Sequence, residues 1–545
     1  MRRRRGKDNL FQGRRHLLGK NHLVASSCPN LAQANLVINS SSLVGMCCRF
    51  ALCTTRLIDW SDFRIAGLSA AFTFCRGCYY CSIGRCVEMW TGSVLVRLSS
   101  PPKGLRVLSP LCSALSSYSN AAHLSTMGDA NQSYQLLIVG GGSGGIGLSS
   151  YFARKLGKGR VGVVEPNEVH TFQPLWTLVG GGLQRIENAT RPMSACLHRN
   201  CSWIKDSVVE FNPDKNMVLT KLGKQIKYEY MIVAMGIQSR LDMVEGAEEA
   251  LKTPGVCSIY FSDYAPKVYR EVQAIQSGNI VFTFPKTPIK CAGAPQKIMY
   301  LTDWTLRKNG IRDRFNMNYN CALGVMFSVP LYAKTMYQIA QSRDLHVNFF
   351  HNLVSVDPGR RIAVFEVGSG ENVTKKEFPY DILHIAPPFS APEVLRNCKA
   401  LTCNAGYLNI DPFTLRHVKY PNIYGIGDCT NLPTSKTLAA ITTQGKVLRR
   451  IILPKLQNKS SDSTITYNGY TSCPLFTSPH SVVMAEFGYD GKIMETFPVD
   501  QNMERRSLFY VAAKLMPIIY WTLHVRGYWE GPSVFRRFLR PFSGD

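Results

Sequence analysis

Three glycines at fixed spacing constrain the fold of this chain more than any other feature. Gly140, Gly142 and Gly145 follow the short apolar run Leu136–Val139, which is typical of a buried parallel strand. In this GxGxxG pattern the first glycine allows a tight turn, the second lets a diphosphate approach the backbone, and the third lets a helix pack on the strand. A helix that begins near Ile146 would direct its N-terminal amides at the phosphates. The pattern therefore predicts a site for an adenine dinucleotide.

The residues after the glycines extend this prediction. Leu148–Leu156 is expected to form the helix and Arg160–Glu165 the next strand, so that Glu165 lies twenty residues beyond Gly145. A carboxylate at that position accepts hydrogen bonds from a ribose diol and disfavours a 2′-phosphate. Strand, glycines, helix, strand and acid together predict the first half of a Rossmann-like domain.

Length and charge limit the choice of partner. A chain of 545 residues is expected to hold two or three domains. Its formal net charge is +26, and residues 1–130 contain 16 Lys and Arg against 5 Asp and Glu, so more than half of the excess lies further on. That later part has no arginine-rich helix or RNA-binding signature. We therefore predict an anionic membrane surface as a partner and no nucleic acid.

The first 130 residues are not expected to form a domain. Four cysteines between Cys75 and Cys86 approach the spacing of an iron–sulfur or zinc site, but no second ligand set follows, so we predict no metal site. The next stretch is rich in Ser and Leu and has no acid until Asp129, which is typical of a mitochondrial transit peptide. We assign residues 1–88 to a dispensable extension and 89–130 to the transit peptide.

The nucleotide domain is predicted to be discontinuous, with residues 131–247 and 373–465 on either side of a second unit. It is expected to resume at Ile382–Pro388 and to reach Tyr424–Thr430. There Asp428 could bind a ribityl hydroxyl of FAD, while a helix that begins near Lys436 directs its positive end at the flavin. The alternative is an aspartate that only caps an ordinary helix.

The second unit, residues 248–372, is predicted to be Rossmann-like without a nicotinamide site. Its first strand, Asn279–Phe284, is followed by Pro285–Pro295, where a pyridine-nucleotide reductase has a second GxGxxG. The missing glycines remove the usual NADH site and place Cys291 at the end of that strand.

The last segment, residues 466–545, is predicted to carry a redox cysteine and to bind a membrane. Ser507–Val525 is apolar and aromatic but interrupted by Lys514 and Pro517, which favours an interfacial helix over a membrane span. In Ser533–Ser543, apolar side chains are expected on one helical face and arginines on the other. The alternative is an amphipathic helix docked on the protein's own core. The fold class is therefore α/β, with two Rossmann-like dinucleotide-binding domains, as in flavoprotein disulfide reductases, and a C-terminal amphipathic membrane-binding segment.

Several short stretches resemble the sulfide:quinone oxidoreductases, specifically the mitochondrial type of animals. They are Val139–Gly145, Glu165–Pro166, Phe172–Pro174, Lys290–Lys297, Gly425–Lys436 and Tyr470–Pro474. The resemblance implies FAD contacts at Gly142, Ser143, Glu165, Gln173, Val208, Asp428 and Lys436. It also implies a redox pair, Cys291 facing the flavin and Cys473 carrying a persulfide.

The resemblance further implies hydrogen sulfide and ubiquinone as substrates, a small thiol such as glutathione, or sulfite, as sulfur acceptor, and the mitochondrial inner membrane as location. Many bacterial members have a third essential cysteine, and here Met217 falls in that region. This departure favours the transfer of one sulfur at a time over a long polysulfide product.

The residues around the two cysteines indicate how they would react. Pro295 is expected to place Cys291 in the first turn of a helix, where the helix terminus together with Lys290 and Lys297 would lower the pKa of the thiol. Pro474 is expected to hold Cys473 on a rigid turn. Cys429 is the rival persulfide carrier, because it neighbours Asp428; the alternative is that it only packs in the core.

Two other functions remain open from the sequence. A type II NADH:quinone dehydrogenase shares the fold, the flavin and the quinone, although the absent second glycine motif and the cysteine pair argue against it. A catalytically silent, membrane-bound flavoprotein is the second alternative.

Overall fold

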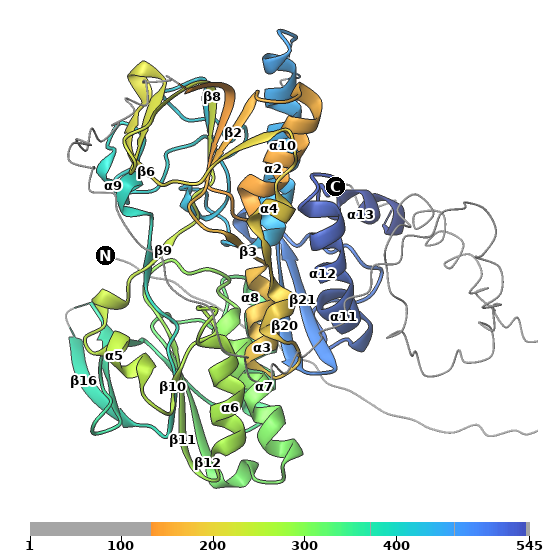
Figure 1. The fold of residues 1–545 in the computed structure, drawn as a ribbon. Helices are drawn as coiled ribbons and strands as arrows, with labels where there is room; N and C mark the ends of the chain where they lie inside the picture. The colour runs from red at the N-terminus through yellow and green to blue at the C-terminus, as the bar shows by residue number, and fades with distance from the viewer. Residues whose placement is uncertain (1–131, 371, 461, 463, 541–545) are drawn as a thin grey trace, which may run out of the picture. The chain divides into compact units, whose positions relative to one another are not determined.

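The computed structural model describes residues 132–540 except 371, 461 and 463. The predicted extension, the transit peptide and the cysteines between Cys75 and Cys86 lie outside these residues. The described chain forms two α/β parts and a C-terminal segment, and the second part is inserted in the sequence of the first (Figure 1).

The first part is built on a seven-stranded sheet. Along the sheet the strands follow the order β5 (Cys201–Ile204), β2 (Val161–Val164), β1 (Gln132–Val139), β8 (Gln225–Val233), β7 (Met217–Thr220) and β6 (Val208–Asn212), and β19 (Ile423–Gly425) also pairs with β8. β1 pairs parallel with β2 and β8, whereas β7 is antiparallel to β6 and β8. The second half of β1 is apolar and buried, in one core cluster with residues of α2 (Ser143–Leu156) and α10 (Leu438–Leu456), and these two helices pack on each other.

The second part contains a five-stranded parallel sheet. Its order is β10 (Val256–Cys257), β17 (Ile382–His384), β11 (Gly278–Phe284), β12 (Phe315–Cys321) and β13 (His346–Phe349). Its longer helices are α6 (Ala265–Ala274), α7 (Ala294–Lys308) and α8 (Pro330–Ser342). An antiparallel sheet of β14 (His351–Asp357), β15 (Ile362–Ser369) and β16 (Asn372–Pro379) precedes β17.

The boundary expected at residue 373 differs from the structure. Ile382–Pro388 was assigned to the first domain, but β17 pairs with β11, with Ile382 opposite Ile280. The expected boundary also falls within the antiparallel sheet, because β16 begins at Asn372 and pairs with β15. A short apolar strand suits either sheet, so its own residues do not say which one it joins.

The C-terminal segment starts with a hairpin and ends in short helices. The hairpin is β20 (Thr471–Ser478) and β21 (Ser481–Phe487), and β20 packs against α7 and α10. The helices are α11 (Arg506–Tyr510), α12 (Met516–Ile519) and α13 (Ser533–Leu539), with the π-helical turns η8 (Val511–Leu515) and η9 (Tyr520–His524) on either side of α12. Among the described residues, no helix combines the length and hydropathy needed to cross a bilayer.

Shorter elements connect these parts. The strands are β3 (Val169–Thr171), β4 (Thr190–Pro192), β9 (Gln238–Ser239) and β18 (Phe389–Ser390), and the helices are α3 (Trp176–Gly180), α4 (Met193–Cys196), α5 (Ala247–Lys252) and α9 (Glu393–Asn397). Single 3₁₀ turns are η1 (Gln173–Leu175), η2 (Ile186–Ala189), η3 (Pro213–Lys215), η4 (Leu241–Met243), η5 (Arg312–Arg314), η6 (Gly427–Cys429) and η7 (Tyr489–Gly491).

Candidate active site

The glycine loop between β1 and α2 has the geometry expected of a diphosphate cradle. Gly140 has φ +104°, and a Cβ there would lie 2.5 Å from the carbonyl oxygen of Ala234. A Cβ on Gly145 would lie 1.8 Å from the oxygen of Gly140, so α2 packs this closely on β1 only with a glycine. A Cβ on Gly142 would meet no atom of the described residues within 4 Å. The loop is therefore open to a ligand at Gly142, where α2 begins.

Helix α2 starts earlier than the sequence suggested. It begins at Ser143, and its first helical hydrogen bond runs from the amide of Ile146 to the oxygen of Gly142, 2.9 Å. The first turn contains no acid, and no side chain of the described residues caps it. These amides are thus available to an anion in front of the loop.

Glu165 lies beside the same loop at the end of β2. One carboxylate oxygen accepts a hydrogen bond from the amide of Gly141 at 2.7 Å, and the other accepts two from Asn167, at 2.8 and 2.7 Å. A carboxylate has about four acceptor positions, so one stays available to a ribose hydroxyl. Val208, the other residue expected near this end of the cofactor, is buried at the start of β6, shortly after β5 ends at Ile204.

The C-terminal segment is hydrogen-bonded to the glycine loop, which the sequence did not suggest. His170 bonds through Nδ1 to the oxygen of Gly141 at 3.1 Å and through Nε2 to the hydroxyl of Tyr520 at 2.7 Å. That hydroxyl lies 2.8 Å from Oγ of Ser143, and Nε2 of His524 lies 2.7 Å from the Ser143 carbonyl oxygen. Burial lowers the pKa of both histidines to about 4, so they are neutral near pH 7.

The hydrogen-bond directions follow from that neutral state. Because the Gly141 carbonyl accepts only, Nδ1 of His170 carries the proton and Nε2 accepts from Tyr520. The Tyr520 hydroxyl then accepts from Ser143, whose own position begins α2. Residues more than 300 positions away in sequence thus hold the first turn of α2 in place.

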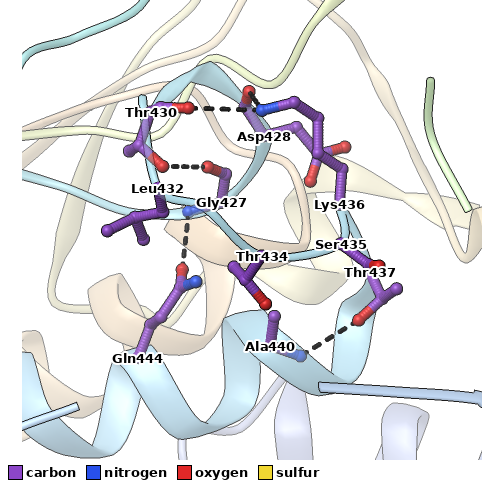
Figure 2. Close-up of a pocket in the computed structure, with 10 residues that line it drawn as sticks. All are labelled: Gly427, Asp428, Thr430, Leu432, Thr434, Ser435, Lys436, Thr437, Ala440 and Gln444. Carbon is purple, nitrogen blue, oxygen red and sulfur yellow. Dashed lines mark hydrogen bonds between the residues drawn. The ribbon is translucent and has the colours of Figure 1, made fainter. Parts of the chain in front are cut away.

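A second loop, between β19 and α10, holds Asp428 and Lys436 (Figure 2). The ammonium of Lys436 donates to the backbone oxygens of Asp428, 2.6 Å, and Thr430, 3.2 Å, while Gln444 accepts from the amide of Gly427, 2.8 Å. Thr437 caps α10. Burial raises the pKa of the Asp428 carboxyl, and the ammonium groups of Lys436 and Lys290 oppose that rise.

The segment that carries Cys291 is attached to this loop. The amide of Cys291 donates to the oxygen of Lys436 at 2.9 Å, and Lys290 and Lys436 form a parallel β-bridge. The ammonium of Lys290 donates to the side-chain oxygen of Gln173 at 3.1 Å. Gln173, Asp428, Lys436 and Cys291, which come from three separate stretches of sequence, therefore lie together.

Cys291 and Cys473 face each other across this site. Their sulfur atoms are 3.6 Å apart, and the ammonium of Lys297 lies 3.1 Å from the sulfur of Cys291. Cys473 is only 2% exposed. The segment after β11 thus brings a thiol, and the first turn of α7 an ammonium, against the hairpin that carries the second thiol.

The local structure at both cysteines differs from the expectation. Cys291 precedes α7 instead of lying in its first turn, because α7 starts at Ala294 with Pro295 in its first turn. Cys473 lies in β20 and not on a turn, with Pro474 after it in the strand. The sheet of β20 and β21 has only two strands, so an edge strand accommodates the proline that lacks an N–H.

The site lowers the pKa of the Cys291 thiol and raises the pKa of the Cys473 thiol. The hydrogen bond from Cys473, followed by the charge of Lys297, lowers the pKa of Cys291 to about 5 against the effect of burial. The pKa of Cys473 is raised well above its usual value by its bond to Cys291 and by burial. Burial lowers the pKa of Lys297, but its interactions with the two cysteines outweigh burial and raise that pKa. Near pH 7 the site therefore holds a Cys291 thiolate, a Cys473 thiol and a Lys297 ammonium.

Cys429 is a core residue. Its side chain is fully buried in the cluster beneath the first sheet, and its sulfur lies 3.5 Å from the backbone oxygens of Val233 and Ile426. Burial raises the pKa of this thiol to about 11. This position favours packing over the persulfide role.

Gly293 leaves the space that the second sulfur occupies. A Cβ there would lie 2.7 Å from the sulfur of Cys473 and 2.5 Å from Cδ2 of Leu475, although the backbone conformation suits any residue. For the activity that the resemblance implies, we expect Gly293→Ala to keep FAD but to separate the sulfurs and lower kcat/KM for sulfide by about 100-fold, as displacements near 1 Å do. Steady-state kinetics and the flavin spectrum measure the two effects.

Gly445→Ala is the matched control for that substitution. A Cβ on Gly445 would be 3.8 Å from its nearest neighbours, an ordinary contact, so this variant should match the wild type. Wild-type turnover by Gly293→Ala would show that the contact between the sulfurs is not needed.

Comparisons with known proteins place this site in a family. The family model described as pyridine nucleotide-disulphide oxidoreductase matches residues 134–273. The sulfide:quinone oxidoreductase of Aquifex aeolicus has a similar fold, with TM-score 0.62 and 17% identity over 76% of this chain and 96% of that one. The cofactor of the chain is FAD. The open side of Gly142 and the uncapped amides of α2 fit the diphosphate of that cofactor.

Two curated relatives are much more similar in sequence. The mitochondrial sulfide:quinone oxidoreductase of Mus musculus is 43% identical over 75% of this chain and 90% of its own length. The mitochondrial enzyme of Dictyostelium discoideum is 40% identical over 73% of this chain and 87% of its own length. The chain therefore belongs to the mitochondrial sulfide:quinone oxidoreductases.

Proposed function

We propose that this chain oxidises hydrogen sulfide at the Cys291–Cys473 pair and passes two electrons through FAD to ubiquinone. The contact of the two sulfurs with the ammonium of Lys297 carries the proposal. The names of the relatives supply sulfide, quinone and the mitochondrion. FAD, when bound, accepts the two electrons from the cysteine pair and passes them to the quinone.

Lys297 suits the binding of hydrosulfide. The side chain is 5% exposed, and when the two cysteines are joined as a disulfide no thiolate remains to balance its charge. A buried ammonium without a counterion is unfavourable, and hydrosulfide is an anion small enough to approach it. The substrate is thereby held beside the bond it attacks.

The position of Lys297 decides which cysteine leaves. Hydrosulfide attacks the sulfur of Cys473, the Cys291–Cys473 bond breaks, and Cys291 departs as a thiolate with the bond's electron pair. Cys291 is the better leaving group because the ammonium of Lys297 lies 3.1 Å from its sulfur and stabilises the departing thiolate. The product is a persulfide on Cys473, with the hydrosulfide proton on its outer sulfur.

A small acceptor then removes the outer sulfur. Sulfite or glutathione attacks it, and Cys473 leaves as a thiolate. Bond formation between the two thiolates restores the disulfide, and FAD, when bound, would accept the two electrons that this step releases. One sulfide is therefore oxidised by two electrons in each cycle. Met217, where many bacterial members are expected to have a third cysteine, lies at the start of β7 in the first sheet, which supports the transfer of one sulfur at a time.

The C-terminal segment supports docking on the mitochondrial inner membrane. Tyr510, Leu515, Ile518 and Leu523, along α11 to η9, are 37 to 51% exposed. On α13 the apolar face is exposed, because Arg536 packs inward over the ring of Tyr470. Arg536 lies on the face opposite these apolar residues and is 5% exposed, whereas its neighbour Arg537 is exposed. An outward apolar face does not suit a helix docked on the protein's own core, and it favours contact with lipid.

Anaerobic stopped-flow spectroscopy tests the function. We expect sulfide to bleach the flavin of the purified protein rapidly and NADH to leave it oxidised, because Pro285–Gly293 replaces a second glycine motif and carries Cys291. Rapid reduction by NADH alone would indicate the type II dehydrogenase instead. No reduction by either donor would indicate a silent flavoprotein.

A further inference from the structure

A cavity of about 260 Å³ lies between α10, the segment 464–470 and α13. Three of its lining side chains are cations, Lys446, Arg450 and Arg536, and most of the others are hydroxyls or amides such as Thr443, Asn468 and Ser533. No Asp or Glu is among the described residues that line it. Its chemistry is therefore that of an anion site.

The positive charge around this cavity exceeds the negative charge. The charges of Arg450, Arg536 and Arg537 act on Lys446 and help burial to lower its pKa, while Glu530 is the acid that opposes them. Glu530 is shared, with one oxygen 3.3 Å from Arg450 and the other 3.8 Å from Arg449. One carboxylate thus faces several cations.

Arg536 is the most constrained of these cations. It is 5% exposed and stacks 4.6 Å from the ring centre of Tyr470. One terminal nitrogen reaches Thr496 at 3.4 Å, and Nε has no hydrogen-bond partner within the described chain. A buried guanidinium in this state is stabilised by an anion that accepts from it.

Helix α13 joins this cavity to an exposed apolar face. The ammonium of Lys446 donates to the hydroxyl of Ser533 at 2.8 Å, at the start of the helix. Val534, Phe535 and Phe538 of the same helix are 60, 47 and 73% exposed. A molecule with a phosphate at one end and apolar chains at the other matches both features at once.

We propose that the cavity between α10 and α13 binds the phosphate group of an anionic membrane lipid, with Lys446, Arg450 and Arg536 as contacts and with Phe535 and Phe538 against its acyl chains. The proposal rests on the membrane docking proposed above. The cation-rich cavity would make attachment selective for anionic lipid, which exposed aromatic residues alone do not provide.

Native mass spectrometry of the FAD-loaded full chain tests the cavity with short-chain phosphatidylglycerol below its micelle concentration. We expect one lipid per chain, and binding weaker by about ten-fold or more in Arg536→Gln, the loss expected for one charge-assisted hydrogen bond. Lys446→Gln combined with Arg450→Gln, on less buried residues, should lose as much and guards against misfolding of the first variant. Lys252→Gln, an exposed cation at the end of α5, is the control and should bind like the wild type.

Equal binding by the wild type and the cavity variants would overturn the proposal. Short-chain phosphatidylcholine should bind more weakly, since it carries no net charge. If inorganic phosphate binds as tightly as the lipid, the cavity is a site for a free anion and the lipid proposal is wrong.

Vesicle flotation separates this proposal from the docking on which it rests. Phe535→Ser with Phe538→Ser should weaken binding to phosphatidylcholine and phosphatidylglycerol vesicles alike. Arg536→Gln should lose only the preference for phosphatidylglycerol. If the wild type floats with neither vesicle, docking itself fails; if it floats with both and equally well, the lipid proposal fails alone.

Discussion

Replacing either Cys291 or Cys473 by serine is expected to lower kcat/KM for sulfide by about three orders of magnitude or more, while FAD stays bound. The reason is that both sulfurs are needed to form the bond that hydrosulfide opens, and they lie 3.6 Å apart with no other cysteine of the described chain in contact with them. The two losses should not add, because residues that act as a unit cost about as much singly as together. Steady-state kinetics on the singles and the double variant test this.

The location of the transferred sulfur gives an independent readout. Mass spectrometry of sulfide-treated wild type should find one extra sulfur on Cys473. Cys429→Ser is the control, and it should retain most activity because Cys429 packs beneath the first sheet, away from solvent. Extra sulfur on Cys429, or a double variant far worse than both singles, would contradict the assignment of the pair.

The nucleotide site could be predicted from sequence because its signal is local. Gly140, Gly142 and Gly145 each impose a backbone requirement within six residues, and each has the geometry that its position in the motif implies. The position of Glu165 could be predicted in the same way, because it directly follows the short strand β2. Even here the start of α2 was misplaced, since apolar periodicity does not mark a helix whose first turn is glycine-rich.

Contacts between segments distant in sequence could not be predicted from local patterns. Cys291 and Cys473 are 182 residues apart, and only a family resemblance paired them. The link from Tyr520 to His170 and Ser143 has no local pattern at all. β17 was expected in the first sheet but pairs with β11 in the second part. A strand of only three residues does not specify which strand it pairs with. Arg536 packs inward over the ring of Tyr470, a residue of a distant segment that the helical pattern of α13 does not indicate.

Lys297→Met is the second substitution with a large expected effect, through the acidity of Cys291. The Cys291 thiol loses its proton at a pKa of about 5, first because of the bond from Cys473 and then because of the ammonium of Lys297, 3.1 Å away. An opposite charge at such a distance shifts a pKa by about 1 to 3 units. Without it, burial remains and the pKa of Cys291 should rise by about that amount.

The sign of the pH effect follows from the ionic form that reacts. A thiolate with a lowered pKa persists until the pH falls to about 5, so the wild type should keep its Cys291 reactivity through neutral pH. In Lys297→Met the loss should begin at higher pH, lowering activity near pH 7 and restoring part of it in alkaline solution. Lys297→Arg keeps the charge and should retain most of the wild-type profile.

The rate of Cys291 alkylation by iodoacetamide against pH, read by mass spectrometry, measures the thiolate directly in the FAD-loaded protein. A Lys297→Met profile that overlays the wild type would assign the low pKa to Cys473 and the start of α7 alone. If Lys297→Met leaves the alkylation profile unchanged but lowers turnover at every pH, Lys297 acts on hydrosulfide and not on Cys291. A shift of both profiles by the same amount would identify the ammonium as the group that keeps Cys291 ionised and able to leave.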